Sequence, residues 1–88
     1  MKIMYYLYLL LCKDGSVYTG ITTDVGRRFL EHVRGAGAHY TASRGAKKIV
    51  YIERCATRSA AARREAEIKK WKRERKLVLI RSIKLASA

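Results

Sequence analysis

The stretch that decides the fold is YLYLLLCKDGSVYTG, residues 6–20. Its first half belongs to an apolar run, residues 3–12, whose leucine and tyrosine content is typical of a buried strand. The segment Lys13-Asp14-Gly15-Ser16 is a turn signal, and residues 17–21 have the composition of a second short strand. The sequence therefore predicts an antiparallel hairpin.

The length of the loop decides which side chains share a face of this hairpin. A two-residue loop would place Tyr8 and Tyr18 on opposite faces. A three-residue loop, Lys13–Gly15 with Gly15 in the left-handed conformation, pairs Leu10 with Tyr18 and turns both phenols to one side. We predict the three-residue loop, because a site shared by the two tyrosines requires it.

Further helices and one more strand are predicted after the hairpin. A helix over residues 24–34 has Thr22, Thr23 and Asp24 as possible N-caps. A polar, basic stretch at 39–45 is expected to be a surface loop with a helical turn at most. A third strand is predicted at 47–54, a helix from 57 or 58 to about 75, and a short helix within 75–85, with a strand as its alternative. The expected class is α/β (α+β), a small three-stranded, mostly antiparallel sheet flanked by helices in the order β-β-α-β-α-α.

Length and charge limit the function classes. The 88 residues are expected to form a single domain, 1–88. The net charge of +13 comes from 20 Lys and Arg against 7 Asp and Glu. Such self-repulsion destabilises a compact chain, and a polyanion is the commonest partner that balances it. Nucleic acid is therefore the favoured partner; the alternatives are a merely soluble basic surface and an acidic membrane.

The cysteines and the first apolar run point to a reducing compartment. Cys12 and Cys55 lie in strand-like runs without metal-ligand spacing, so we expect small buried side chains. The run at residues 3–12 is too short to span a bilayer and lacks a small-residue cleavage site. We expect a cytoplasmic protein that does not bind membranes.

The inventory of reactive residues excludes several mechanisms. The chain contains no HExxH, CxxC or glycine-rich phosphate loop, and seven carboxylates scattered along it do not suggest a two-metal site. Tyrosine, arginine, histidine and one semi-buried glutamate remain. This set suits phosphodiester hydrolysis with one divalent ion, because a metal and a guanidinium stabilise charge while a phenol or imidazole handles the proton.

Each candidate also has a purely structural interpretation. Tyr8 and Tyr18 could be ordinary strand aromatics, Arg28 a helix-surface cation, and His32 a core histidine. Arg28 and His32 are four positions apart, so on a helix their side chains can meet. Glu65 lies at the edge of the apolar stripe of its helix, where an acid must pair with a cation or bind a metal.

The order of these residues resembles the GIY-YIG nuclease family, in particular its small single-domain, uncharacterised members of the UPF0213 type. The two motif triplets are Tyr6-Leu7-Tyr8 and Tyr18-Thr19-Gly20, and the second continues through Val25 to a pair of arginines. Residues 37–41 and 48–53 also look like that subgroup, and the likeness spans roughly residues 5–79.

The resemblance implies a set of catalytic roles. Tyr8 and Tyr18 would line the active site, with Tyr18 favoured for activating the attacking water. Arg28 would stabilise the phosphate, His32 matches a histidine found in many members, and Glu65 would bind a single Mg²⁺ or Mn²⁺ ion. The expected activity is a metal-dependent endonuclease acting on DNA phosphodiester bonds with low intrinsic sequence specificity, in repair or recombination.

Other residues are predicted to contact the nucleic acid. Gly20 would let the substrate approach the backbone, and basic or aromatic side chains would hold it: Arg27, Tyr40, Arg44, Lys69 and Lys72. The expected partner is DNA, structured or branched, with RNA as an alternative and with specificity supplied by a protein partner. The rival interpretation is a non-catalytic nucleic-acid-binding module on the same fold.

Overall fold

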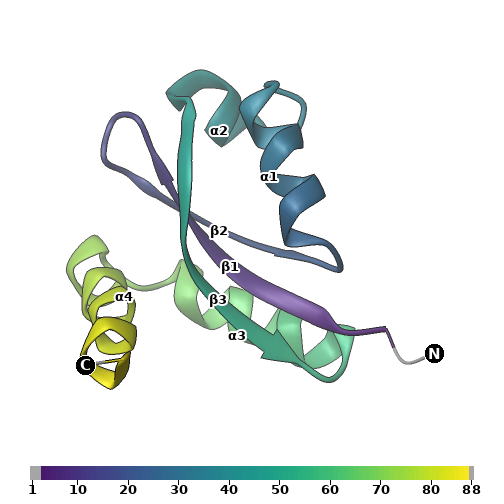
Figure 1. The fold of residues 1–88 in the computed structure, drawn as a ribbon, viewed down its shortest axis with the longest axis vertical. Helices are drawn as coiled ribbons and strands as arrows, with labels where there is room; N and C mark the ends of the chain where they lie inside the picture. The colour runs from purple at the N-terminus through teal and green to yellow at the C-terminus, as the bar shows by residue number, and fades with distance from the viewer. Residues whose placement is uncertain (1–2, 88) are drawn as a thin grey trace.

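Three strands form one antiparallel sheet with helices on both faces (Figure 1). The computed structural model describes residues 3–87. The strands are β1 (Tyr5–Cys12), β2 (Val17–Thr22) and β3 (Ala46–Cys55), and the helices are α1 (Val25–Val33), α2 (His39–Arg44), α3 (Arg58–Lys69) and α4 (Arg73–Ser87). The strand order is β2-β1-β3, so β1 is central and β2 is an edge strand. The predicted α/β (α+β) class is confirmed, with the short helix α2 added to the expected order.

The register of the hairpin is the one that the three-residue loop predicts. Leu10 lies opposite Tyr18, so Tyr8 and Tyr18 share a face. Gly15 adopts a φ of +86°, and its N–H donates to the carbonyl oxygen of Cys12 at 3.0 Å. Glycine adopts this left-handed conformation without the steric cost that a Cβ imposes.

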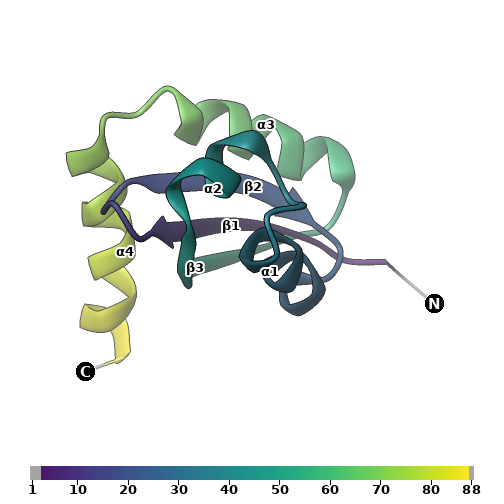
Figure 2. The same ribbon diagram turned by 90° about the horizontal axis from the view of Figure 1, so that it is seen from above.

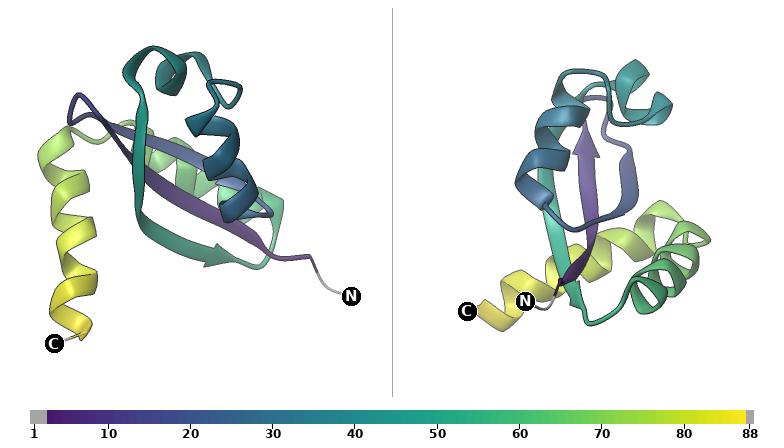
Figure 3. Two further views of the ribbon diagram at one scale, coloured as in Figure 1. Left: turned by 45° about the horizontal axis from the view of Figure 1, so that its top comes forward. Right: turned by 90° about the vertical axis from the view of Figure 1, so that its right-hand side faces the viewer.

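The two faces of the sheet are covered by different helices (Figures 2 and 3). Helices α1 and α2 cover the face that carries Tyr8, whereas α3 and part of α4 pack on the other face. The odd-numbered residues Leu7 and Leu9 point toward α3, where they meet Ala61 and Ile68 in a fully buried apolar core. The alternation of a β-strand therefore divides β1 into an apolar side and a side with tyrosine.

The break between the last two helices differs from the sequence prediction. Helix α3 ends at Lys69 rather than near Arg75, and α4 starts at Arg73. The N–H of Trp71 donates to the carbonyl of Ile68 at 3.0 Å, which tightens the last turn. The Trp71 indole packs against the apolar core with the Arg75 guanidinium 4.1 Å from its ring centroid. No glycine or proline marks this break, so nothing in the local sequence predicts it.

The predicted surface loop at residues 39–45 is instead helix α2 followed by Gly45 at a φ of +80°. Its Thr41 is completely buried, because the side chain turns inward beneath α1. Other predictions for these elements hold: Asp24 caps α1 by accepting the Arg27 N–H at 3.0 Å, and Cys12 and Cys55 are buried free thiols. Within the described residues, no helix combines the length and apolar character needed to cross a membrane.

Candidate functional site

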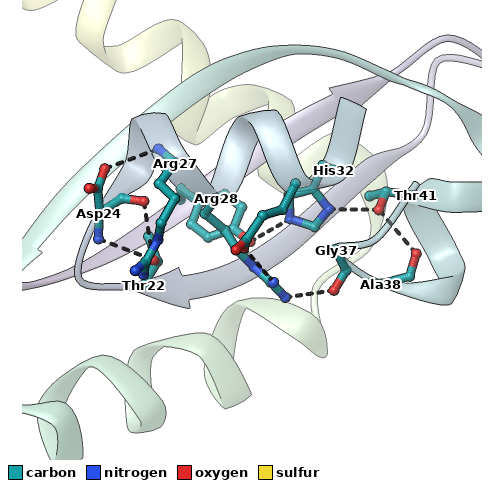
Figure 4. A network of polar contacts seen from close by, with 10 residues as sticks. Thr22, Asp24, Arg27, Arg28, His32, Gly37, Ala38 and Thr41 are labelled. Carbon is teal, nitrogen blue, oxygen red and sulfur yellow. Dashed lines mark hydrogen bonds and ion pairs between the residues drawn. The ribbon is translucent and has the colours of Figure 1, made fainter. Parts of the chain in front are cut away.

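The floor of the candidate site is a buried chain of hydrogen bonds between β1, α1 and α2. The Tyr8 hydroxyl lies 2.7 Å from Nε2 of His32, whose Nδ1 lies 2.6 Å from Oγ1 of Thr41. Thr41 donates its own proton to the carbonyl of Ala38 at 3.2 Å, so its oxygen accepts from His32 (Figure 4). Nδ1 therefore carries the imidazole proton, and Nε2 accepts the proton of the Tyr8 phenol.

Two glycines make room for these side chains. A Cβ at Gly20, opposite Tyr8 in the hairpin, would lie 2.5 Å from the Tyr8 hydroxyl oxygen. A Cβ at Gly37 would lie 2.5 Å from Nδ1 of His32. Both contacts are shorter than non-bonded atoms tolerate, so any larger residue would displace the phenol or the imidazole.

Burial sets the protonation of both groups. Loss of solvent raises the pKa of Tyr8 to about 12, and the neighbouring Arg28 guanidinium opposes that rise only in part. Burial, followed by the charge of Arg28, lowers the pKa of His32 below its ordinary 6.5. At neutral pH the site therefore holds a protonated phenol beside an uncharged imidazole that can accept its proton.

Arg28 is fixed in place by two acceptors. Its guanidinium donates to Oε1 of Glu31 at 3.0 Å. It also donates to the carbonyl oxygen of Gly37 at 2.7 Å (Figure 4). The hydrogen bond to Glu31 raises the pKa of Arg28 further. The side chain is 28% exposed, so a held cation remains open to solvent on one side.

Tyr18 completes an aromatic cluster around the imidazole. Its ring centroid lies 6.3 Å from that of Tyr8, 5.1 Å from that of His32 and 5.7 Å from that of Tyr40. Tyr18 is partly exposed, whereas Tyr8 and His32 are each 1% exposed. Tyr18 thus forms the outer wall of the site and Tyr8 its floor.

Glu65 approaches from the opposite side of the sheet. It lies on α3 with a side chain that is 23% exposed, and its Oε2 pairs with Nζ of Lys69 at 3.4 Å. The charge of Glu65 is one of the causes that raise the pKa of Tyr8, so the carboxylate acts on the phenol. Because β2 is an edge strand, an acid on α3 can influence this site past that edge.

A single carboxylate matches one kind of metal site. Among the residues that the structure describes, no three His, Cys, Asp or Glu side chains gather in a way that could hold an ion. Mg²⁺ is commonly held by one or two carboxylates while keeping several waters and contacting substrate phosphates. Glu65 is partly exposed, and its one ion pair within the described residues is with the half-exposed Lys69, so it fits one such ion.

Two clefts lie at opposite ends of β2 and α3. The first, which we term the arginine cleft, has a volume of about 280 Å³ and is lined by Tyr5, Ile21, Thr22, Thr23, Arg27, Arg28, Glu31 and Arg58. The second, the lysine cleft, has a volume of about 340 Å³ and is lined by Val17, Tyr18, Thr19, Tyr40, Lys69 and Lys76. On β2, Gly20 lies between Thr19 of the lysine cleft and Ile21 of the arginine cleft. On α3, Glu65 lies between Arg58 of the arginine cleft and Lys69 of the lysine cleft. The candidate site therefore lies between the two clefts.

The residues predicted to contact nucleic acid are divided between these features. Arg27 lines the arginine cleft, and Tyr40 and Lys69 line the lysine cleft. Arg44 lies 4.0 Å from the centroid of the Tyr40 ring and pairs with Asp14. Lys72 lies in the turn between α3 and α4 and lines neither cleft.

Sequence reasoning missed three residues that position the site: Glu31, Gly37 and Thr41. Thr41 lies in a stretch that the sequence predicts as a surface loop, and its burial depends on the docking of α2. Glu31 is three positions after Arg28, a helical spacing at which an acid and a base pair readily. That spacing is the one signal that could have identified it.

Comparison with known proteins gives consistent matches. Residues 4–77 match the family model of the GIY-YIG catalytic domain. A UPF0213 protein of Staphylococcus saprophyticus is 46% identical over 76 residues, covering 86% of this chain and 93% of its own. One from Haloquadratum walsbyi is 51% identical over 72 residues, covering 82% and 81%. The solution NMR structure of a UPF0213 protein from Bacillus halodurans is 44% identical with a TM-score of 0.56, covering 88% and 82%.

Proposed function

Since this chain belongs to the GIY-YIG family and is related to its UPF0213 proteins, we propose that it is a metal-dependent endonuclease that hydrolyses DNA phosphodiester bonds. The observation that carries the proposal is the hydrogen bond from the Tyr8 phenol to the uncharged His32, beside the Arg28 guanidinium. A proton acceptor, a cation and an acid are the groups that phosphodiester hydrolysis requires.

Tyr8 and His32 together can take up a proton from the attacking water. A phenol with a pKa of about 12 is a poor base alone, because it is protonated at neutral pH. If its proton moves to Nε2 of His32 as the oxygen accepts one from water, no phenolate has to exist in advance. The sequence favoured Tyr18 for this task, but the hydrogen bonds support Tyr8, with Tyr18 enclosing the reacting water.

Arg28 would hold the scissile phosphate. Its two bonds to Glu31 and Gly37 orient the guanidinium before the substrate arrives, so little reorganisation is needed as charge develops. Glu65 would hold one Mg²⁺ or Mn²⁺ ion, which when bound supplies Lewis-acid stabilisation of charge on the phosphate and the leaving oxygen.

The substrate is proposed to be DNA with little sequence selection. The net charge of +13 and the cationic clefts on both sides of the site support backbone contacts, which bind every sequence alike. We further propose that the DNA is structured or branched and that a protein partner supplies specificity. The proposed role is in repair or recombination.

The test is nicking of circular DNA by the purified chain with and without Mg²⁺ or Mn²⁺. We expect metal-dependent nicking that is lost in Arg28→Ala and kept in Arg34→Ala, a matched change at an exposed arginine that ends the same helix. Circular dichroism checks that both variants fold. Equal nicking by both variants would remove Arg28 from the site.

The strong charge favours one rival, a module that binds nucleic acid without cutting it. That rival predicts DNA binding that weakens steeply with salt and no nicking with either metal. Cleavage by wild type that is lost in Arg28→Ala would reject it.

A further inference from the structure

The lysine cleft contains a buried hydroxyl without a partner. Thr19 is 2% exposed, and within the described part of the chain its Oγ1 is fully shielded and forms no hydrogen bond. Thr19 is also one of the residues that line the cleft. Buried polar atoms are nearly always satisfied, so an orphan hydroxyl at a cleft indicates a ligand atom that completes it.

Two lysine side chains line the same cleft. Lys69 comes from the end of α3 and Lys76 from the first turns of α4, which the break between these helices brings together. Burial and the charge of Lys69 lower the pKa of Lys76. Lys76 forms no ion pair among residues 3–82, and Lys69 pairs only with Glu65. Two lysines and a single carboxylate leave an excess of positive charge at the cleft, which suits an anionic ligand.

The aromatic wall of the cleft favours a phosphate over a base as that ligand. The Tyr40 ring already has two neighbours, the Tyr18 ring at 5.7 Å and the Arg44 guanidinium at 4.0 Å. Stacking of a base on Tyr40 would have to displace one of them. A compact anion, by contrast, needs only the hydroxyl and the two ammonium groups.

We propose that the lysine cleft binds one backbone phosphate of a nucleic acid, through Lys69, Lys76 and the Thr19 hydroxyl. This inference rests on the proposed function. It assumes that the bound phosphate belongs to the same DNA strand that is cut at the site beside Gly20 and Glu65, and that it flanks the scissile phosphate. Thr19 in this cleft and Thr22 in the arginine cleft are about 10 Å apart along β2 at 3.3 Å per residue. One strand with a few consecutive phosphates would therefore fill both clefts and cross the site.

The test is binding of a fluorescein-labelled single-stranded DNA, measured by anisotropy in EDTA so that no cleavage occurs. We expect Lys76→Gln to weaken DNA binding about tenfold. The steepness of the fall of the log binding constant with log salt should decrease by about 0.7, the value for one phosphate contact on a single strand. The matched control is Lys48→Gln, at an exposed lysine on β3, the opposite edge of the sheet. Equal losses in the two variants would overturn the proposal.

A second variant tests the hydroxyl. Thr19→Val keeps the shape of the side chain, so it should fold and yet bind the same DNA several-fold more weakly. Wild-type affinity in Thr19→Val would contradict a site built around Oγ1. Competition by inorganic phosphate at matched ionic strength separates two ligand sources: displacement from wild type but not from Lys76→Gln identifies free phosphate as an occupant, and no displacement identifies the diester.

The two proposals fail separately. A chain that never nicks DNA but shows the Lys76 and Thr19 effects keeps the phosphate site and loses the endonuclease assignment. A chain that nicks DNA while Lys76→Gln binds like Lys48→Gln keeps the endonuclease and loses the phosphate site.

Discussion

The two faces of β1 are built from alternating residues of one strand, and they differ in the contacts that their buried side chains make. Toward α3, Leu7 and Leu9 are completely buried among apolar side chains. Toward α1, the equally buried Tyr8 ends in a polar chain with His32 and Thr41. The apolar face holds the fold together without directional bonds, whereas the polar face carries the hydrogen-bonded chain to which we assign proton transfer.

The comparison teaches that burial alone does not distinguish the apolar core from the proposed site. His32 and Thr41 are as inaccessible as the core leucines, and a buried imidazole is commonly structural. What distinguishes them is the direction of the hydrogen bonds, which leaves Nε2 of His32 facing the Tyr8 phenol beside Arg28. Substitutions on the two faces should therefore affect different measurements.

The largest expected effect is on catalysis. Tyr8→Phe should reduce the nicking rate about 10²–10⁴-fold, the usual contribution of a positioned acid–base group. The matched change is Tyr51→Phe, which removes a phenol on the apolar face whose hydroxyl donates to Glu53 at 2.6 Å. Single-turnover rates should be unchanged in Tyr51→Phe, and a similar loss in both variants would erase the distinction between the faces.

The next effect is on stability. Leu7→Ala should lower the free energy of unfolding by about 2–5 kcal/mol, because it deletes a fully buried side chain and leaves a cavity. Ile68→Val, in the same core, should cost only about 0.5–1.5 kcal/mol. Urea denaturation measures both, and the nicking rate per folded molecule should stay constant. A rate that falls with stability would indicate that the apolar face also shapes the site.

The polar face should make stability depend on pH. The pKa of folded His32 lies below 6.5, so the unfolded chain binds the proton first as the pH falls. The free energy of unfolding should therefore decrease below pH 6.5 and level off below the folded pKa. Nicking should fall in the same window, because imidazolium cannot accept the Tyr8 proton.

The histidine variants check this assignment. The pH dependence of unfolding should disappear in His32→Asn and persist in His39→Asn, since His39 is exposed at the start of α2. Persistence of the full dependence in His32→Asn would assign it to another group.

The smallest expected effect concerns the orphan hydroxyl. Thr19→Val should raise the free energy of unfolding by about 1 kcal/mol, because it removes an unsatisfied buried polar group while keeping the shape. Thermal denaturation of the ligand-free chain measures it. A destabilised Thr19→Val would mean that the hydroxyl is already satisfied in the free protein.

Sequence reasoning succeeded where local chemistry decides the outcome. The loop with Gly15 determined the hairpin register, and that register placed Tyr8 and Tyr18 on one face. The position of Glu65 at the edge of an apolar stripe left a cation or a metal as its partner; the structure pairs it with Lys69, and the metal stays a prediction. Capping of α1 at Asp24 was an equally local signal.

Features that depend on tertiary packing were beyond the sequence. The break after Lys69 follows from the docking of Trp71 on the core, and it brings Lys76 to Lys69. The burial of Thr41 requires α2 to fold back beneath α1. The catalytic roles and the single-domain organisation stay predictions, which the variants above address in part.

The most direct test of the account is the metal dependence of nicking in a pair of glutamate variants on α3. Glu65 is expected to serve the site from the opposite face, whereas Glu67, two residues on, pairs with Arg64. Glu65→Gln should abolish nicking at every concentration of Mg²⁺ or Mn²⁺ while the chain remains folded, and Glu67→Gln should cut like wild type. Nicking by Glu65→Gln at the wild-type rate and metal dependence would contradict the proposed site.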